Sequence, residues 1–184
     1  MTAWAFMRVM IYRTFNRVFT MKFATSTVQT SYQSPLGIML LAASEKQVAG
    51  IWFAGQRHQP DSSHWARDDQ HPLLQRVKNE LAEYFAGQRH AFDLPLNLEC
   101  GTAFQQAVWH ALLALPYGST SSYGELSSAI GKPSAVRALG AAVGRNPFSI
   151  VVPCHRVIGA KGALTGYAGG LERKAALLKI EGVL

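Results

Sequence analysis

Residues 122–144 have the sequence SYGELSSAIGKPSAVRALGAAVG. Ser122 followed three residues later by Glu125 is a capping-box pattern, which predicts the start of a short helix, and Gly131 predicts its end. Pro133 then favours the first turn of another helix, because the backbone N–H that proline lacks has no helical partner there. Two short helices about a glycine-containing turn predict a helix-turn-helix.

The second of these helices presents two different faces. The residues expected to pack inward are Val136, Leu139, Gly140 and Val143, and those expected to point outward are Ser134, Arg137, Ala138, Ala141 and Ala142. Small residues allow a backbone to lie close to a nucleic-acid groove with little reading of base edges. The pattern alone is equally compatible with a helix that is buried on both sides.

The flanking segments are also expected to be helical. Thr102 and Gln105 form a second capping-box pattern, followed by an apolar stripe of Phe104, Val108, Leu112 and Leu115. A last helix is predicted from about Leu171 to Ile180, with Gly182 just beyond it. The region 101–184 is therefore predicted to be mostly helical.

The region 23–100 has a different pattern. Thr27 to Phe53 alternates and contains apolar runs joined by polar turns, which predicts two or three antiparallel strands. Residues 55–71 are polar and are expected to form a loop. A helix follows with Leu74, Val77, Leu81 and Phe85 on one face and Gly87 as its end, and residues 90–100 are expected to be an extended connector. We therefore expect an α+β protein with domains at 23–100 and 101–184, preceded by an extension at 1–22.

Composition excludes several classes of protein. The chain has 184 residues, of which 48% are hydrophobic and 16% charged, so it can bury a core. Apolar runs such as Ile38–Ala43 are too short to cross a bilayer, so no membrane association is expected. Two cysteines, Cys100 and Cys154, cannot form a disulfide scaffold and indicate a reducing compartment, which predicts a cytoplasmic protein.

The net charge of +7 is unevenly distributed. Residues 1–22 contribute +4, residues 23–100 contribute −2, and residues 101–184 contribute +5. The first segment is apolar, contains arginines and lacks acids, which resembles a transit peptide in composition, whereas Met21 offers an alternative start that would make it a loosely held extension. The C-terminal half is the better candidate for an anion-binding surface.

The segment NPFSIVVPCHRVIG, residues 146–159, contains the strongest chemical feature. A strand-like run, Ile150–Val152, leads through Pro153 to Cys154, His155 and Arg156. A cysteine is nucleophilic as the thiolate, and a neighbouring base or cation favours that form. The alternative is a buried, unreactive thiol, which is a common state of cysteine beside apolar residues.

The C-terminal half resembles the catalytic domain of the O6-alkylguanine-DNA alkyltransferases, also called methylated-DNA–protein cysteine methyltransferases. The matching segments are GTAFQQAVW, LPYG, SYGELSSAIGKP, AVRALGAAVGRNP, PCHRVIG and LTGYAGGLERKAALL, and the match extends more loosely over residues 27–100. The resemblance implies a small antiparallel sheet with a helix, like ribonuclease H, followed by a helical domain with a helix-turn-helix.

The resemblance also implies roles for the residues around the cysteine. Cys154 is expected to accept the alkyl group from O6 of guanine, and His155 to take the thiol proton through a water molecule. Glu181 is expected to orient His155, and Asn146 to brace the turn that holds the cysteine. Each molecule would act once, because a thioether is a poor substrate for water, and no cofactor or metal is implied.

Further roles concern the DNA and the damaged base. Tyr123 is expected to donate a proton or hydrogen bond to the leaving guanine and to press on a phosphate. Arg137 is expected to fill the stack vacated by the flipped nucleotide. Other DNA contacts are expected from Ser134, Ala138, Ala141 and Arg156, and the base pocket from Val157, Tyr167, Ala168, Gly169 and Lys174. The expected partner is double-stranded DNA with an alkylated guanine, bound by a monomer; activity on O4-alkylthymine is left open.

Some positions depart from the family pattern. Ala168 stands where many relatives have serine, and Tyr117 where relatives often have a second cysteine. Some members bind zinc through N-terminal cysteine and histidine, but residues 1–99 contain no cysteine. The remaining candidates, His58, His64 and His71, have loop spacing and are expected to be solvated.

Two other functional classes compete with an alkyltransferase. A non-catalytic protein that flags lesions would lack the acceptor cysteine, whereas Cys154 is present. A helix-turn-helix regulator would need base-reading side chains on the outward helix face, which carries only Arg137 among small residues.

Overall fold

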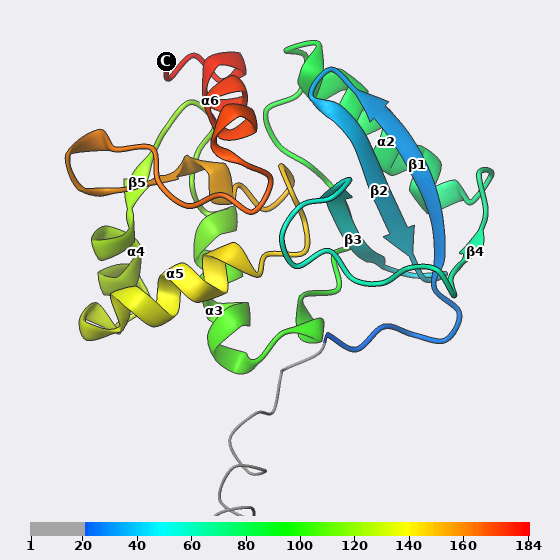
Figure 1. The fold of residues 1–184 in the computed structure, drawn as a ribbon, viewed down its shortest axis with the longest axis horizontal. Coiled ribbons are helices and arrows are strands. Elements are labelled where there is room, and N and C mark those ends of the chain that lie inside the picture. The colour runs from blue at the N-terminus through cyan, green and yellow to red at the C-terminus, as the bar shows by residue number, and fades with distance from the viewer. Residues whose placement is uncertain (1–20) are drawn as a thin grey trace, which may run out of the picture.

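The computed structural model describes residues 21–184, so nearly all of the expected extension at 1–22 lies outside the described residues. The N-terminal half is a four-stranded sheet covered on one face by a helix, and the C-terminal half is mainly helical (Figure 1). The strands are β1 (Val28–Ser34), β2 (Gly37–Ala43), β3 (Val48–Phe53), β4 (Ala66–Arg67), β5 (Ser121–Ser122) and β6 (Val157–Ile158). The helices are α2 (Pro72–Phe85), α3 (Ala103–Leu113), α4 (Tyr123–Ala129), α5 (Val136–Gly144) and α6 (Leu171–Ile180).

The sheet has the order β3-β2-β1-β4. β1, β2 and β3 pair antiparallel, as the alternating pattern predicts, with Thr30 opposite Leu41 and Leu41 opposite Ile51. β4 pairs parallel to β1 and lies inside the segment expected to be only a loop. That expectation was wrong at these two residues because a strand so short leaves no periodic signal.

β3 connects the two halves of the molecule. It is buried along its whole length, which fits its nearly continuous run of apolar residues. Ile51 donates its backbone N–H to Pro147 O and accepts one from Ser149 N, each at 2.8 Å. One hydrophobic core therefore runs from the sheet and α2 into the helices of the C-terminal half.

The predicted helix ends are confirmed where local chemistry sets them. Both capping boxes form: the Thr102 and Ser122 side chains accept from the backbone N–H groups of Gln105 and Glu125, whose side chains accept in return. α6 ends before Gly182, whose φ of +73° lies in the left-handed region that glycine tolerates.

The two-residue ladder between β5 and β6 positions the functional region. Ser121 lies opposite Val157 and Ser122 opposite Ile158. The start of α4 is thereby tied to the segment that follows Cys154, His155 and Arg156. In the described part of the chain, no helix is long and apolar enough to cross a bilayer.

Candidate active site

Asn146 organises the loop that carries Cys154. Its Oδ1 accepts from Phe148 N at 3.0 Å, and its Nδ2 donates to Val152 O at 2.8 Å and to Cys154 Sγ at 3.1 Å. The expected strand at 150–152 was wrong, because these residues form a turn and Ile150 has a φ of +74°. A β-branched residue adopts that conformation only when its surroundings impose it. The Asn146 amide supplies the partners that the turn backbone would otherwise lack.

His155 and Arg156 both bind the carboxylate of Glu181. His155 Nε2 lies 2.7 Å from Glu181 Oε1, and Arg156 donates from Nε to Oε2 at 2.8 Å and from Nη2 to Oε1 at 3.0 Å. Burial opposes the charge on Glu181, but the hydrogen bonds and charges of His155 and Arg156 outweigh it and lower the pKa of Glu181 to about 2. Glu181 is therefore ionised and accepts hydrogen bonds only.

The ionised Glu181 sets the tautomer of His155. Burial lowers the pKa of His155 despite the opposing effect of Glu181, so the imidazole is neutral at pH 7. Because Glu181 cannot donate, the single ring proton must be on Nε2. Nδ1 is then a free base, and it is buried without a protein hydrogen-bond partner.

Arg156 does not fit the expected contact with DNA. It is 5% exposed, and its guanidinium is engaged by Glu181 and by Leu115 O. Arg156 is also not the neighbouring cation that favours the thiolate form of Cys154. Its guanidinium charge is neutralised by Glu181, which is distant in the sequence.

Lys174 is the cation that acts on the sulfur. Burial raises the pKa of the Cys154 thiol, while the Asn146 hydrogen bond and the charge of Lys174 oppose that rise. Lys174 Nζ donates to Val157 O and to Thr165 O, and burial lowers its pKa to about 8. Cys154 is therefore a protonated thiol at rest, and the Asn146 hydrogen bond and the Lys174 charge offset only part of the effect of burial.

Two of the expected pocket residues line a hollow of about 460 Å³. Tyr167 and Ala168 form one side, and Tyr123 with Gly140 and Ala141 of the C-terminal helices forms another. Of the other expected pocket residues, Val157 and Lys174 are fully buried. Gly169 is required by packing, since a Cβ there would lie 2.8 Å from the Tyr167 ring.

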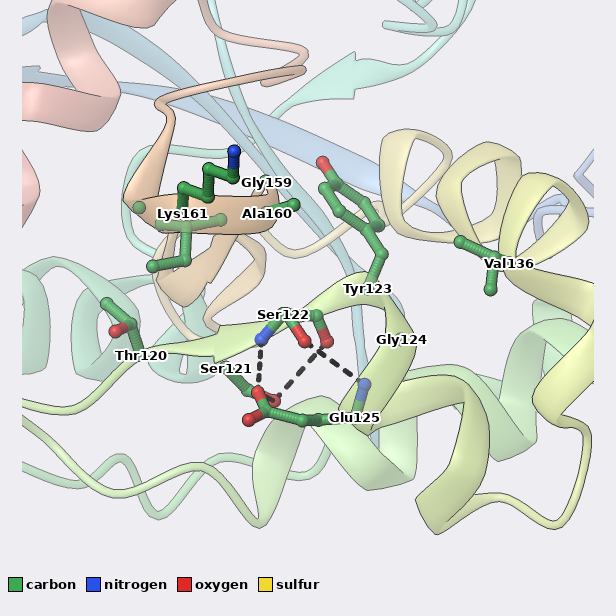
Figure 2. A pocket seen from close by; sticks show the side chains of 12 residues that line it. Thr120, Ser121, Ser122, Tyr123, Gly124, Glu125, Val136, Gly159, Ala160 and Lys161 are labelled. Carbon is green, nitrogen blue, oxygen red and sulfur yellow. Dashed lines mark hydrogen bonds between the residues drawn. The ribbon is translucent and has the colours of Figure 1, made fainter.

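Tyr123 stands between this hollow and a second one. Its hydroxyl lies 3.4 Å from both Thr165 O and Gly166 O, and burial raises its pKa, so it remains a donor at neutral pH. Figure 2 shows Tyr123 between the segment around Lys161 and Val136, where the second hollow has a volume of about 650 Å³.

The outward face of α5 agrees with the sequence pattern except at two positions. Ser134, Arg137, Ala138 and Ala141 are exposed. Val136, expected to point inward, is 40% exposed and lines the second hollow, whereas Ala142, expected to point outward, is 3% exposed. α5 packs on α3 there, and Trp109 Nε1 donates to Ala142 O at 3.1 Å.

Four residues near the site were not expected there from the sequence. Tyr84 of α2 donates to Glu181 Oε1 at 2.8 Å, and Arg57, His58 and Arg145 line the hollow that contains Tyr123. No sequence motif identifies them, because each reaches the site by tertiary packing. Among residues 21–184, no three His, Cys, Asp or Glu side chains gather in a possible metal site, so His58, His64 and His71 form no such group.

Comparisons with known proteins give a consistent result. A family model described as the DNA-binding domain of 6-O-methylguanine DNA methyltransferase matches residues 103–183, and the ribonuclease-like domain of the same family matches residues 27–98. The methylated-DNA–protein-cysteine methyltransferase of Mycobacterium tuberculosis is 48% identical over 148 residues, covering 80% of this chain and 88% of that protein. The protein of the same name from Haemophilus influenzae is 44% identical over 158 residues, covering 85% and 87%.

Solved structures agree with the sequence comparisons. The crystal structure of Mycobacterium tuberculosis O6-methylguanine methyltransferase has a TM-score of 0.78 at 46% identity and covers 84% of this chain and 92% of that one. The Mycobacterium tuberculosis OGT in complex with DNA gives 0.76 at 46% identity, with coverage of 82% and 90%. The chain therefore belongs to the methylated-DNA–protein-cysteine methyltransferase family, and it repairs DNA by transferring an alkyl group to a cysteine.

Proposed function

We propose that Cys154 is the alkyl acceptor and that the damaged base is an O6-alkylguanine in double-stranded DNA. The observation that carries this proposal is the Asn146 amide, 3.1 Å from Cys154 Sγ, together with the unpaired Nδ1 of the next residue in the chain, His155. Cys100 is the other cysteine, and burial raises its pKa to about 11 without a neighbouring base to oppose this. Unlike Cys154, Cys100 has neither an asparagine amide nor a lysine charge acting on its thiol to favour loss of the proton.

The reaction balances with groups of the protein, the damaged base and water. Cys154 Sγ attacks the alkyl carbon, a C–S bond forms, and the bond from that carbon to O6 of guanine breaks. The thiol proton passes through a water molecule to His155 Nδ1, and Glu181 stabilises the resulting imidazolium. Tyr123 donates a proton to the departing guanine, because the unprotonated anion leaves poorly, and the resulting phenolate regains a proton from solvent. The thioether product has no easy route to hydrolysis, so each molecule reacts once.

The DNA is bound by α4 and α5 acting as a helix-turn-helix. Arg137 enters the stack in place of the flipped nucleotide, while the small side chains of Ser134, Ala138 and Ala141 let the helix approach the backbone. The flipped base occupies the hollow beside Tyr167 and Ala168, and Gly169, Val157 and Lys174 shape the loop behind it.

Three basic side chains support the path of the DNA across this hollow. Arg57 and His58 come from the N-terminal half and Arg145 from the end of α5. Partial burial and the charges of Arg145 and Arg57 lower the pKa of His58, which indicates that the three groups lie close together. A cluster of this kind suits a phosphate. We further propose that the chain acts as a monomer in a reducing cytoplasm, without a cofactor, and that its domains divide near residue 100.

A labelled substrate tests the proposal. Duplex DNA with a labelled O6-methylguanine is incubated with the protein, and the label is located by peptide mass spectrometry. One label per molecule on Cys154, absent from Cys154→Ala and retained in Cys100→Ala, is the expected result. Lesion binding with unmodified protein would contradict the proposal and indicate a lesion-flagging protein instead.

A further inference from the structure

Tyr84 joins the sheet-bearing half of the molecule to the carboxylate of Glu181. It lies on α2, is fully buried, and donates its hydroxyl hydrogen to Glu181 Oε1 at 2.8 Å across 97 positions of sequence. The same oxygen lies 2.7 Å from His155 Nε2. The hydroxyl therefore contacts the very atom that sets the tautomer of His155.

The Tyr84 hydroxyl is a permanent donor in this arrangement. Burial and the negative charge of Glu181 raise its pKa, so the hydroxyl is protonated at neutral pH. A hydrogen bond from a neutral hydroxyl to a buried carboxylate is stronger than one between neutral groups. It also restricts the rotation of the carboxylate, which would otherwise be held from the side of His155 and Arg156 alone.

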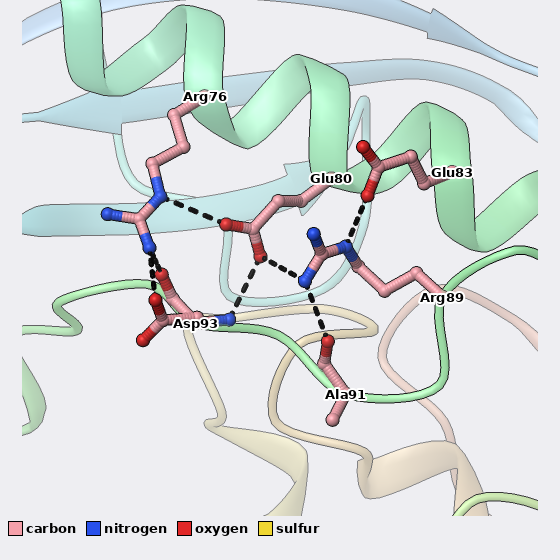
Figure 3. A network of polar contacts seen from close by, with 6 residues as sticks. All are labelled: Arg76, Glu80, Glu83, Arg89, Ala91 and Asp93. Atoms are coloured by element: carbon pink, nitrogen blue, oxygen red, sulfur yellow. Dashed lines mark hydrogen bonds and ion pairs between the residues drawn. The ribbon is translucent and has the colours of Figure 1, made fainter.

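α2 is itself fixed by a polar network (Figure 3). The Glu80 carboxylate lies between Arg76 and Arg89, at 3.0 and 3.3 Å, and accepts from Asp93 N at 2.9 Å. These contacts hold the connector that follows α2 against the helix. The connector contains Phe92, whose ring lies 5.6 Å from that of Tyr84. Tyr84 is thus anchored on a helix of the N-terminal half, while its hydroxyl reaches a carboxylate of the C-terminal half that contains Cys154.

We propose that Tyr84 is a positioning residue for alkyl transfer. It acts through Glu181, which it fixes in the orientation that keeps the His155 proton on Nε2 and leaves Nδ1 free to accept the Cys154 proton. The ribonuclease-like half then affects the chemistry through Glu181. This inference rests on the proposed role of Cys154 and His155.

Removal of one hydroxyl gives a direct test. Single-turnover alkylation of Cys154 by the free base O6-benzylguanine is measured against pH for the wild type and for Tyr84→Phe. We expect the plateau rate to fall about five- to tenfold, because proton acceptance by His155 depends on its alignment. We also expect the acidic limb of the profile to move to higher pH, because a carboxylate with one donor fewer favours protonated His155 more strongly.

Tyr117→Phe is the matched control. The Tyr117 hydroxyl donates to Ile180 O at 2.9 Å, one residue before Glu181, and its ring lies 6.3 Å from that of Tyr84. This variant loses a hydroxyl and a hydrogen bond from the same region but none from the carboxylate. Its acidic limb should match that of the wild type. Equal changes in both variants, or none in Tyr84→Phe, would overturn the proposal.

A double-mutant cycle separates positioning from loss of stability. If Tyr84 acts through Glu181, Tyr84→Phe should slow the reaction no further when Glu181→Gln is already present. Additive losses would refute the coupling. Failure of the wild type itself to become alkylated on Cys154 would instead disprove the proposed function, so the two failures are distinguishable.

Discussion

The side-chain amide of Asn146 joins Cys154 Sγ, at 3.1 Å, to the carbonyl oxygen of Val152, at 2.8 Å. One nitrogen thus bonds both the sulfur and the turn that presents it. A turn with Ile150 at a φ of +74° is costly without such a partner, since its buried backbone groups would lack hydrogen bonds. We therefore expect the stability of this loop and the proposed reactivity of Cys154 to depend on the same residue.

Asn146→Ala should reduce both properties. We expect the free energy of unfolding to fall by about 2–4 kcal/mol, because several buried hydrogen bonds are lost together. We expect alkylation of Cys154 to slow by more than about tenfold. Urea unfolding and single-turnover labelling measure the two effects. Asn97→Ala is the control, since that side chain caps no helix. A variant as reactive as the wild type would contradict the role of Asn146.

Acid should destabilise the protein in two steps. The pKa of His155 lies below its usual 6.5, so the unfolded state binds more protons and stability begins to fall as pH drops through 6.5. The pKa of Glu181 is lowered from 4.5 to about 2, so its contribution is complete above 4.5 and is lost between 4.5 and 2. That contribution corresponds to about 3 kcal/mol.

Glu181→Gln isolates the second step. The variant should be less stable at pH 7, because Arg156 loses its buried counter-charge. Its stability should then decline less steeply than that of the wild type between pH 4.5 and 3. Urea unfolding over a pH series gives both curves, and parallel curves in that interval would show that Glu181 does not titrate as expected.

Arg137→Ala should separate repair in duplex DNA from reaction with a free base. Arg137 is exposed on α5, whereas Cys154 and its partner Asn146 are buried. If it holds the flipped state, the variant should repair duplex DNA about tenfold more slowly, since extrusion of a base costs a few kcal/mol. Its reaction with O6-benzylguanine should be unchanged. Equal loss on both substrates would refute the assigned role.

The basic rim, formed by Arg57, His58 and Arg145, should determine part of the salt dependence of DNA binding. Arg57→Gln and Arg145→Gln each remove a charge at the hollow that contains Tyr123. If each contacts a phosphate, the slope of log affinity against log salt should decrease in magnitude by about 1 per variant. Lys46→Gln, in the exposed turn between β2 and β3, is the control. A slope unchanged in all three variants would exclude the rim from the interface.

Local patterns predicted a large part of the fold. The two capping boxes, the apolar stripe of α2 and the last helix are confirmed, because caps and periodicity act within a few residues. Ile150–Val152 was misread as a strand, because a β-branched run indicates β structure unless a distant partner imposes a turn. Val136 and Ala142 exchanged their expected positions because the packing of α3 on α5, and not the helical period alone, sets which side is covered.

The sequence alone determined the helices, the three antiparallel strands of the sheet and the segment that carries Cys154 and His155, because these depend on neighbours in the chain. Only the tertiary structure decided what each polar group binds. It buried Arg156 against Glu181, brought Lys174 to the sulfur, and set the hydroxyl of Tyr84 on a carboxylate 97 positions away. The physical reason is that a buried charge requires a partner, and packing can supply that partner from any part of the chain.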